Sequence, residues 1–233
     1  MPSLTTIYSP GLGQLGTLAR YERLLLAKLR LSPTDVWVDK DDYFKNNANP
    51  WLEQVAGTGA ASGRFELPGG YFQLASGATA ASSIAQWGGG TVSNTKTKKW
   101  GIVARFRTTT AVDAQSKWGI GIRDGSGANQ SVMIGSFGGL STTHYVLQHD
   151  GDLTGSGLST GVALDTNTDH IFLVYCLGDN VYRISTDGGA ELTVTPTAPV
   201  VNNPSLFRYV QNGTTAAART LFLDWHVALG ERA

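Results

Sequence analysis

The chain has 233 residues, enough for one large β domain, and its 29 glycines and 15% charged residues suit short strands and tight turns. Eighteen basic and eighteen acidic side chains balance each other, so no long-range field attracts nucleic acid or an anionic membrane, and we expect neither as a partner. The single cysteine, Cys176, excludes an intrachain disulfide and lies in an apolar run typical of a buried thiol.

The first predicted element is an amphipathic helix over residues 15–31, whose apolar side chains form one narrow stripe at 100° per residue. The stripe comprises Leu18, Tyr21, Leu25 and Leu29, and the arginines behind it include Arg20 and Arg23. Two interpretations are open: the helix covers a face of its own domain, or it docks on a separate polypeptide. We adopt the second, which makes residues 1–34 an N-terminal arm and residues 35–233 a self-contained domain.

From residue 99 onward the apolar residues recur with a period of two, which predicts β-strands. The predicted strand segments are residues 99–109, 117–124, 131–137, 144–150, 170–186 and 220–229. In the last segment five alternate apolar residues, from Leu221 to Leu229, are expected to share one face. Trp100, Trp118 and Trp225 alternate in phase with Ile and Leu and are expected in the core. Turn clusters separate these strands, so we predict an all-β fold, an antiparallel two-sheet β-sandwich.

Two glycine motifs lack the context that their chemistry requires. Gly11-x-Gly13-x-x-Gly16, followed by Asp35, matches a dinucleotide fingerprint, but hairpins follow it instead of βαβ units. Residues 157–161 match the G-x-S-x-G esterase elbow around Ser159, yet no helix follows the serine. Asp169 and His226 complete a triad only on paper. We therefore expect neither motif to be functional.

The sequence predicts no metal, no cofactor and no catalytic residues. The four histidines show no tight metal-ligand spacing. Asp124, Asp150 and Asp152 carry oxygens that calcium accepts as ligands, but Asx turns explain aspartates at these positions equally well. No strand carries the acid-x-acid spacing that would project two carboxylates from one side. We therefore expect that the protein is not an enzyme.

Two further tryptophans, Trp51 and Trp87, fall in predicted loops. Exposed aromatic rings can stack against sugars. These two residues are therefore the candidates for a carbohydrate-binding surface.

The order of residues 99–109, 118–124, 144–151, 164–189 and 220–229 resembles the concanavalin A-like (laminin G-like) jelly roll. Residues 36–60 resemble the opening of such domains in tailed-bacteriophage virion proteins. The resemblance covers about residues 35 to 231 and implies a jelly-roll fold that binds through its surface. The acid-x-acid motif of the family's glycosidases is missing here, so the resemblance does not imply their activity.

The leading hypothesis is a bacteriophage virion structural protein, a capsid decoration protein that docks by its N-terminal arm. Its partners would be the major capsid protein or a neighbouring structural protein and further copies of itself, assembled in the host cytoplasm. The alternative is a carbohydrate-binding module of a phage tail or fibre that adsorbs to host glycan. A third hypothesis is a sandwich glycoside hydrolase or lyase.

Overall fold

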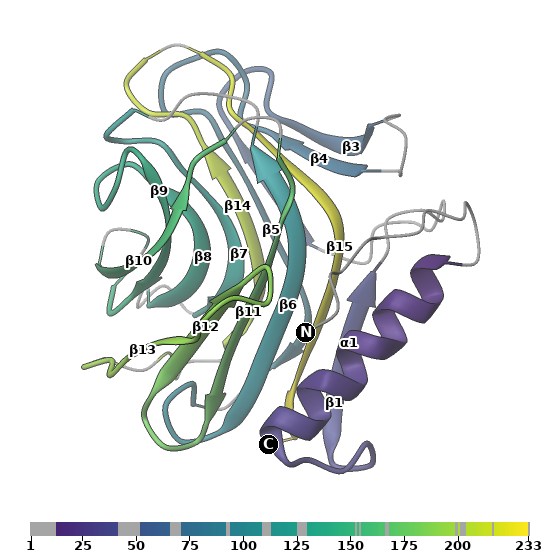
Figure 1. Cartoon of the computed structure of the whole chain (residues 1–233). Coiled ribbons are helices and arrows are strands. Elements are labelled where there is room, and N and C mark those ends of the chain that lie inside the picture. Colours follow the sequence, from purple (N-terminus) through teal and green to yellow (C-terminus); the bar gives the residue numbers. More distant parts are fainter. Residues whose placement is uncertain are drawn as a thin grey trace.

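The computed structural model describes residues 13–41, 52–65, 71–91, 94–108, 113–124, 130–151, 153, 155–165, 168–198, 200, 204–215 and 217–232. These residues form one helix and fifteen strands (Figure 1): α1 (Gly13–Leu29), β1 (Val36–Asp41), β2 (Leu52–Ala56), β3 (Ala61–Phe65), β4 (Tyr71–Ala75), β5 (Ser83–Thr91), β6 (Lys99–Thr108), β7 (Lys117–Arg123), β8 (Ser131–Phe137), β9 (His144–His149), β10 (Ser156–Ala163), β11 (His170–Leu177), β12 (Tyr182–Thr186), β13 (Leu192–Val194), β14 (Ser205–Gln211) and β15 (Thr220–Glu231).

The strands form two sheets that face each other as a sandwich (Figure 1). Sheet A has the order β13-β12-β11-β6-β15-β4-β3, and β1 also pairs with β15. Sheet B has the order β10-β9-β8-β7-β14-β5-β2. All of these pairings are antiparallel. The predicted all-β, two-sheet antiparallel fold with one helix near the N-terminus is therefore confirmed.

The main core lies between the two sheets and is built from alternate side chains of their strands. Trp100 of sheet A and Trp118 of sheet B are fully buried there, as the period of two predicted. The indole Nε1 of Trp100 donates a hydrogen bond to the backbone oxygen of Thr95 at 2.8 Å. The two largest buried rings therefore fill the interior of the sandwich, one from each sheet.

Strand β15 changes the face on which its apolar side chains lie, because it contains a β-bulge. Leu223 and Trp225 pair with the adjacent residues Phe106 and Arg105 of β6, which leaves Asp224 as the extra residue. Before the bulge, Leu221 and Leu223 belong to the core between the sheets; after it, the side chains on the outer face are Trp225, Val227 and Leu229. The prediction that five alternate residues share one face is wrong, because an extra residue shifts the period by one.

Helix α1 covers the outer face that this bulge creates (Figure 1). Leu18, Leu25 and Leu29 are buried against sheet A of the same chain. The ring of Tyr21 stacks on Trp225 with 4.7 Å between centroids. The expectation that this stripe docks on a separate polypeptide is therefore wrong for the described structure. An intramolecular counterpart exists, and using it avoids the entropy loss of association.

Close packing fixes the position of the helix on β6. A Cβ atom added at Gly101 would collide with the Leu25 side chain and press against Tyr175. The absence of a side chain at residue 101 therefore lets the helix approach the sheet.

A Schellman motif ends the helix just after Leu29. Arg30 adopts a left-handed conformation (φ 54°). Its N–H donates to the Ala27 oxygen at 3.3 Å, and the Leu31 N–H donates to the Leu26 oxygen at 3.1 Å. The turn directs the chain into β1, which pairs with β15.

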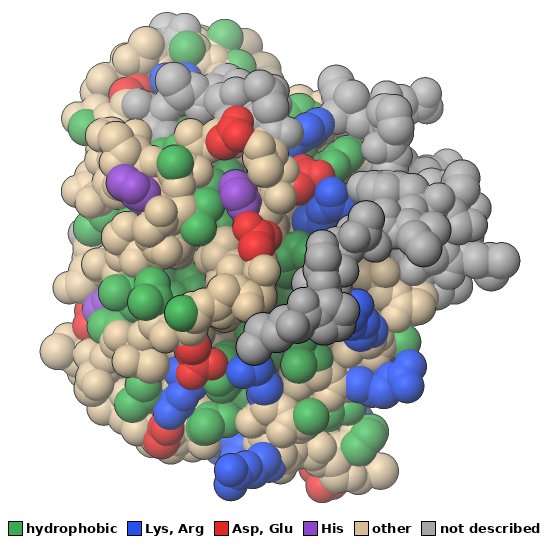
Figure 2. Space-filling model, viewed as in Figure 1, with side chains coloured by type: hydrophobic (Ala, Val, Ile, Leu, Met, Phe, Trp, Pro, Cys, Tyr) green, Lys and Arg blue, Asp and Glu red, His purple; other side chains and the backbone are tan. Residues whose placement is uncertain are grey.

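The arginines of α1 remain on the outer surface, where Lys and Arg side chains gather over the helix (Figure 2). Arg20 and Arg23 are exposed. On the same helix, Glu22 forms an ion pair with Lys40 of β1, with 2.6 Å between the carboxylate oxygen and the ammonium nitrogen. A partner-binding role for the two arginines remains a prediction.

An ion-pair network surrounds the bulge on the outer face of sheet A. Arg105 donates to Asp224, the extra residue, at 2.6 Å and to Asp169 at 2.8 Å. Arg107 lies 3.6 Å from the second oxygen of Asp169, and the Tyr71 hydroxyl donates to the same carboxylate. The side chains of Asp169 and Asp224 are 8% and 3% exposed. Arg105 is thus the cation shared by two nearly buried carboxylates.

Candidate functional site

The two glycine motifs are structural. Gly11 lies outside the described residues, and Gly13 and Gly16 belong to α1, which packs on an antiparallel sheet. Ser159 lies on β10, at the edge of sheet B. Asp169 belongs to the network around Arg105, and His226 points into the sandwich and hydrogen bonds with Asp39 at 2.8 Å. The structure therefore does not assemble a Ser159, Asp169 and His226 triad.

Of the three turn aspartates, Asp150 is the one whose side-chain contacts to the backbone the structure gives. Asp152 lies outside the described residues, and Asp124 is buried at the end of β7. Asp150 accepts hydrogen bonds from the N–H groups of Thr197 at 2.8 Å and Ala198 at 2.6 Å. Among the described residues, no group of three or more His, Cys, Asp or Glu side chains could hold a metal ion. Asp150 therefore ties one loop to another.

The substitution Asp150→Asn is expected to lower the free energy of unfolding by about 1–2 kcal/mol at neutral pH, because an amide oxygen replaces a charged acceptor. Burial raises the pKa of Asp150, but the hydrogen bonds from Thr197 and Ala198 outweigh burial and lower it overall. A carboxyl whose pKa is lower in the folded state contributes stability above its unfolded pKa of about 4, and that contribution disappears as the pH falls through the folded pKa. Urea unfolding of both proteins should therefore differ at pH 7, and the difference should shrink as the pH falls below about 4. A difference that does not change with pH would exclude this role.

The strands of sheet B bend, which makes the outer face of the sheet concave (Figure 1). Glycines of the central strands β7 and β8 lie on this face: a Cβ added at Gly121 would collide with the backbone oxygen of Val132, and one at Gly135 with that of Trp118. The sheet bends toward this face, and the bend brings backbone atoms of neighbouring strands too close to leave room for a Cβ atom. The absence of side chains at these positions permits the curvature.

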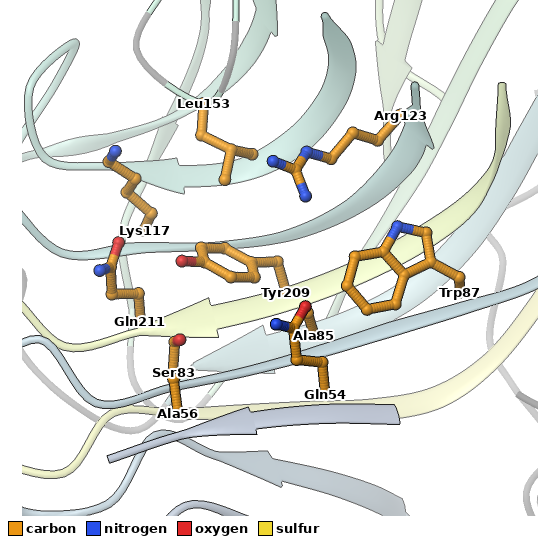
Figure 3. Close-up of a pocket in the computed structure, with 10 residues that line it drawn as sticks. All are labelled: Gln54, Ala56, Ser83, Ala85, Trp87, Lys117, Arg123, Leu153, Tyr209 and Gln211. Atoms are coloured by element: carbon orange, nitrogen blue, oxygen red, sulfur yellow. The ribbon is translucent and has the colours of Figure 1, made fainter. Parts of the chain in front are cut away.

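A pocket of about 360 Å³ forms the first hollow on this concave face (Figure 3). It is lined by Gln54, Ala56, Ser83, Ala85, Trp87, Lys117, Arg123, Leu153, Tyr209 and Gln211. These residues come from β2, β5, β7 and β14, and Leu153 comes from the loop after β9. Along each strand they are separated by even numbers of residues, which places them on one face.

The rings of Trp87 and Tyr209 form an aromatic platform in the pocket, and the ring of Phe207 packs against both. Trp87 lies 5.1 Å from Phe207, and Phe207 stacks on Tyr209 at 5.7 Å between centroids. Phe207 is fully buried, whereas Trp87 and Tyr209 are partly exposed. The guanidinium of Arg123 lies 4.9 Å from the centre of the Phe207 ring. The buried ring thus supports two rings that a ligand can reach.

A second hollow of about 570 Å³ continues from the first one. The two share Lys117, Leu153 and Gln211. The second is further lined by Ala80, Ala81, Ala114, Gln115, Gly139, Asn212, Gly213 and Thr214. Together they form one elongated groove, which we call the sheet B groove.

Hydrogen bonds hold the loop that carries Leu153 over the groove. The Leu153 N–H donates to the Ser131 hydroxyl at 3.1 Å. The Gly151 oxygen accepts from Ser131 and from the Gln148 side chain at 2.9 Å. Ser131 and Gln148 are themselves buried, so this side of the groove is preorganised.

Of the two tryptophans proposed for sugar binding, Trp87 lines the sheet B groove and Trp51 lies outside the described residues. Trp87 belongs to strand β5, not to a loop. The sequence interpretation missed Tyr209, Lys117 and Arg123. A signal for Tyr209 was present: in residues 205–211 Leu206 and Val210 point inward, so the aromatic residues between them must face outward.

The sequence matches no protein-family model and no curated protein. Solved structures with similar folds include a protein of unknown function from Shewanella oneidensis MR-1, with a TM-score of 0.60, 18% identity and 99% of each chain covered. A glycoside hydrolase family 16 endo-glucanase from Bacteroides ovatus has a TM-score of 0.55 and 10% identity, with 81% of this chain and 98% of that chain covered. Peanut lectin has a TM-score of 0.53 and 9% identity, with 84% and 97% covered.

These similarities change one expectation from the sequence. From the sequence we predicted that the protein is not an enzyme, and we excluded glycosidase activity. The fold that the chain shares with an endo-glucanase overturns that prediction. The bacteriophage part of the resemblance rests on the sequence alone. No described helix is long and apolar enough to cross a membrane. The chain has the concanavalin A-like jelly-roll fold, which it shares with a lectin and a family 16 glycoside hydrolase.

Proposed function

We propose that the protein binds a carbohydrate chain in the sheet B groove. The observation that carries the proposal is the platform of Trp87 and Tyr209, which is partly exposed inside the first hollow of the groove, where most of the lining side chains are polar. Similarity of fold to a lectin and an endo-glucanase supports it.

The chemistry of the groove suits sugars. Sugar rings present C–H groups on their faces, which pack on aromatic rings, and hydroxyls at their edges, which require hydrogen bonds. Gln54 and Gln211 supply amide donors and acceptors, and Ser83 supplies a hydroxyl. These groups surround the aromatic platform (Figure 3). One sugar unit on the platform can therefore satisfy both requirements.

The substitution Trp87→Ala is expected to weaken glycan binding about 10- to 100-fold, because it removes one of the two partly exposed aromatic rings on which a sugar can pack. A glycan array with wild-type protein identifies a ligand, and titration calorimetry then gives the dissociation constant of each variant. Val55→Ala is the matched control: Val55 is exposed on β2 between the lining residues Gln54 and Ala56 and points away from the groove. Circular dichroism checks that both variants are folded. Equal affinities of Trp87→Ala and Val55→Ala would refute the proposed site.

Catalysis is measured separately. Glycoside hydrolases generally use two carboxyl groups about 5–9.5 Å apart, and the described residues that line the sheet B groove include no aspartate or glutamate. These residues therefore support binding. A reducing-end assay on the ligand from the array shows whether cleavage accompanies it.

The virion location, with assembly in the host cytoplasm, remains a prediction from the sequence. The docking of α1 on its own sheet removes the leucine stripe as an argument for it. Host adsorption through a glycan is the form of that hypothesis that agrees with the sheet B groove. Mass spectrometry of purified phage particles tests the location.

A further inference from the structure

Among the described residues, the charged side chains that line the sheet B groove are both basic. Lys117 and Arg123 are present, whereas the described lining of both hollows contains no Asp or Glu. The whole chain has equal numbers of basic and acidic residues, eighteen of each. The lining thus departs from the neutral balance of the chain.

The two cations are spaced along the groove. Lys117 and Arg123 are the first and last residues of β7, six residues apart and therefore on the same face. That separation is at most about 20 Å along the strand. In Figure 3 their side chains lie on opposite sides of Tyr209, and Lys117 also borders the second hollow. The groove can therefore bind two separate acidic groups, one at Lys117 and one at Arg123.

The two cations recognise acidic groups in different ways. The Arg123 guanidinium lies over the Phe207 ring at 4.9 Å, and its planar fork fits a carboxylate or sulfate through paired hydrogen bonds. Lys117 supplies a compact point charge on the lining that both hollows share. Both side chains also interact within the chain, so the inference depends on where their charges lie and not on vacant donors.

We infer that the sheet B groove selects acidic polysaccharides, which carry carboxylate or sulfate groups on more than one sugar unit. This inference rests on the proposed carbohydrate binding. The elongated groove accommodates a chain, the Trp87 and Tyr209 rings bind sugar faces, and Lys117 and Arg123 bind acidic groups on either side of Tyr209.

Matched pairs of glycans that differ only in charge test the inference. Polygalacturonate is compared with its methyl ester, and dextran sulfate with dextran, by calorimetry on the wild-type protein at low and high salt. We expect the acidic member of at least one pair to bind about tenfold or more tightly than its neutral partner. Its affinity should fall as salt rises, because salt screens charges at the surface.

The variant Lys117→Gln/Arg123→Gln keeps hydrogen-bonding groups and removes both charges, so it should lose the preference for the acidic member. Arg20→Gln/Arg23→Gln, on α1 outside sheet A, removes the same charge far from the groove and should keep that preference. The wild-type comparison decides the question even where the first variant does not fold.

The outcomes separate the two claims. Equal affinity for acidic and neutral members would overturn the selectivity and retain carbohydrate binding. Equal loss in both variants would also overturn it, because the effect would then come from total charge. Tighter binding of a single-stranded oligonucleotide than of any acidic glycan would overturn it in favour of nucleic acid. Failure of every glycan on the array and in both pairs would overturn the proposed function itself.

Discussion

Replacing Leu25 by alanine is expected to lower the free energy of unfolding by about 2–5 kcal/mol, because it opens a cavity between α1 and sheet A. Leu25 is fully buried, and its side chain lies against the bare backbone of Gly101. That face of the sheet is rigid, so it cannot move to fill the space. Urea unfolding of the protein at low concentration measures the change.

Leu24→Ala is the control for this prediction. Leu24 is the next residue on the helix, but it is 37% exposed, so its loss should change stability by no more than about 0.5 kcal/mol. The comparison also decides between the two interpretations of the helix. A helix that docked on another polypeptide would give the isolated protein equal stability in both variants.

Replacing Arg105 by methionine is expected to destabilise the protein by about 3–5 kcal/mol. The substitution keeps the length of the apolar stem and removes the cation that Asp169 and Asp224 share. Desolvated carboxylates that lose their partner are costly, since the interior cannot replace the interaction with water. Asp169 retains Arg107 at 3.6 Å.

A second substitution, Asp224→Asn, should recover part of that loss, because it neutralises the carboxylate that Arg105 no longer balances. Lys28→Met is the control: it breaks the more exposed ion pair between Lys28 and Glu191 and should cost no more than about 1 kcal/mol. Thermal unfolding of the four proteins provides the comparison. Arg105→Met as stable as Lys28→Met would show that the network contributes little.

The strands with a clear alternating pattern, and the sandwich that they indicate, were predictable from the sequence because that pattern is local. An alternating pattern such as that of residues 99–108 places Trp100 and Ile102 on one face without reference to the rest of the chain. The bulge at Asp224 was not predictable in this way. It depends on how β15 pairs with β6, and it moves Trp225 from the inner core to the outer face.

The site was harder to predict because its parts are far apart in the sequence. Trp87, Lys117 and Tyr209 meet only because β5, β14 and β7 are neighbours in sheet B. Strand order of this kind arises from long-range pairing, which no short segment encodes. The helix illustrates the same limit. Its stripe was correctly predicted as apolar, but the sequence did not show that Val227 and Leu229 would form its counterpart.

The bend of the central strands has an implication for how this surface changes over time. Gly121 and Gly135 have no room for a side chain, so main-chain geometry shapes the curved face of the sheet at these positions. Exchanges at Trp87, Lys117 or Arg123 would therefore alter which molecule is accepted while the depression itself persists. A scaffold of this type can acquire a new specificity through a few of the residues that line the groove, provided that the two glycines of the curved sheet are retained.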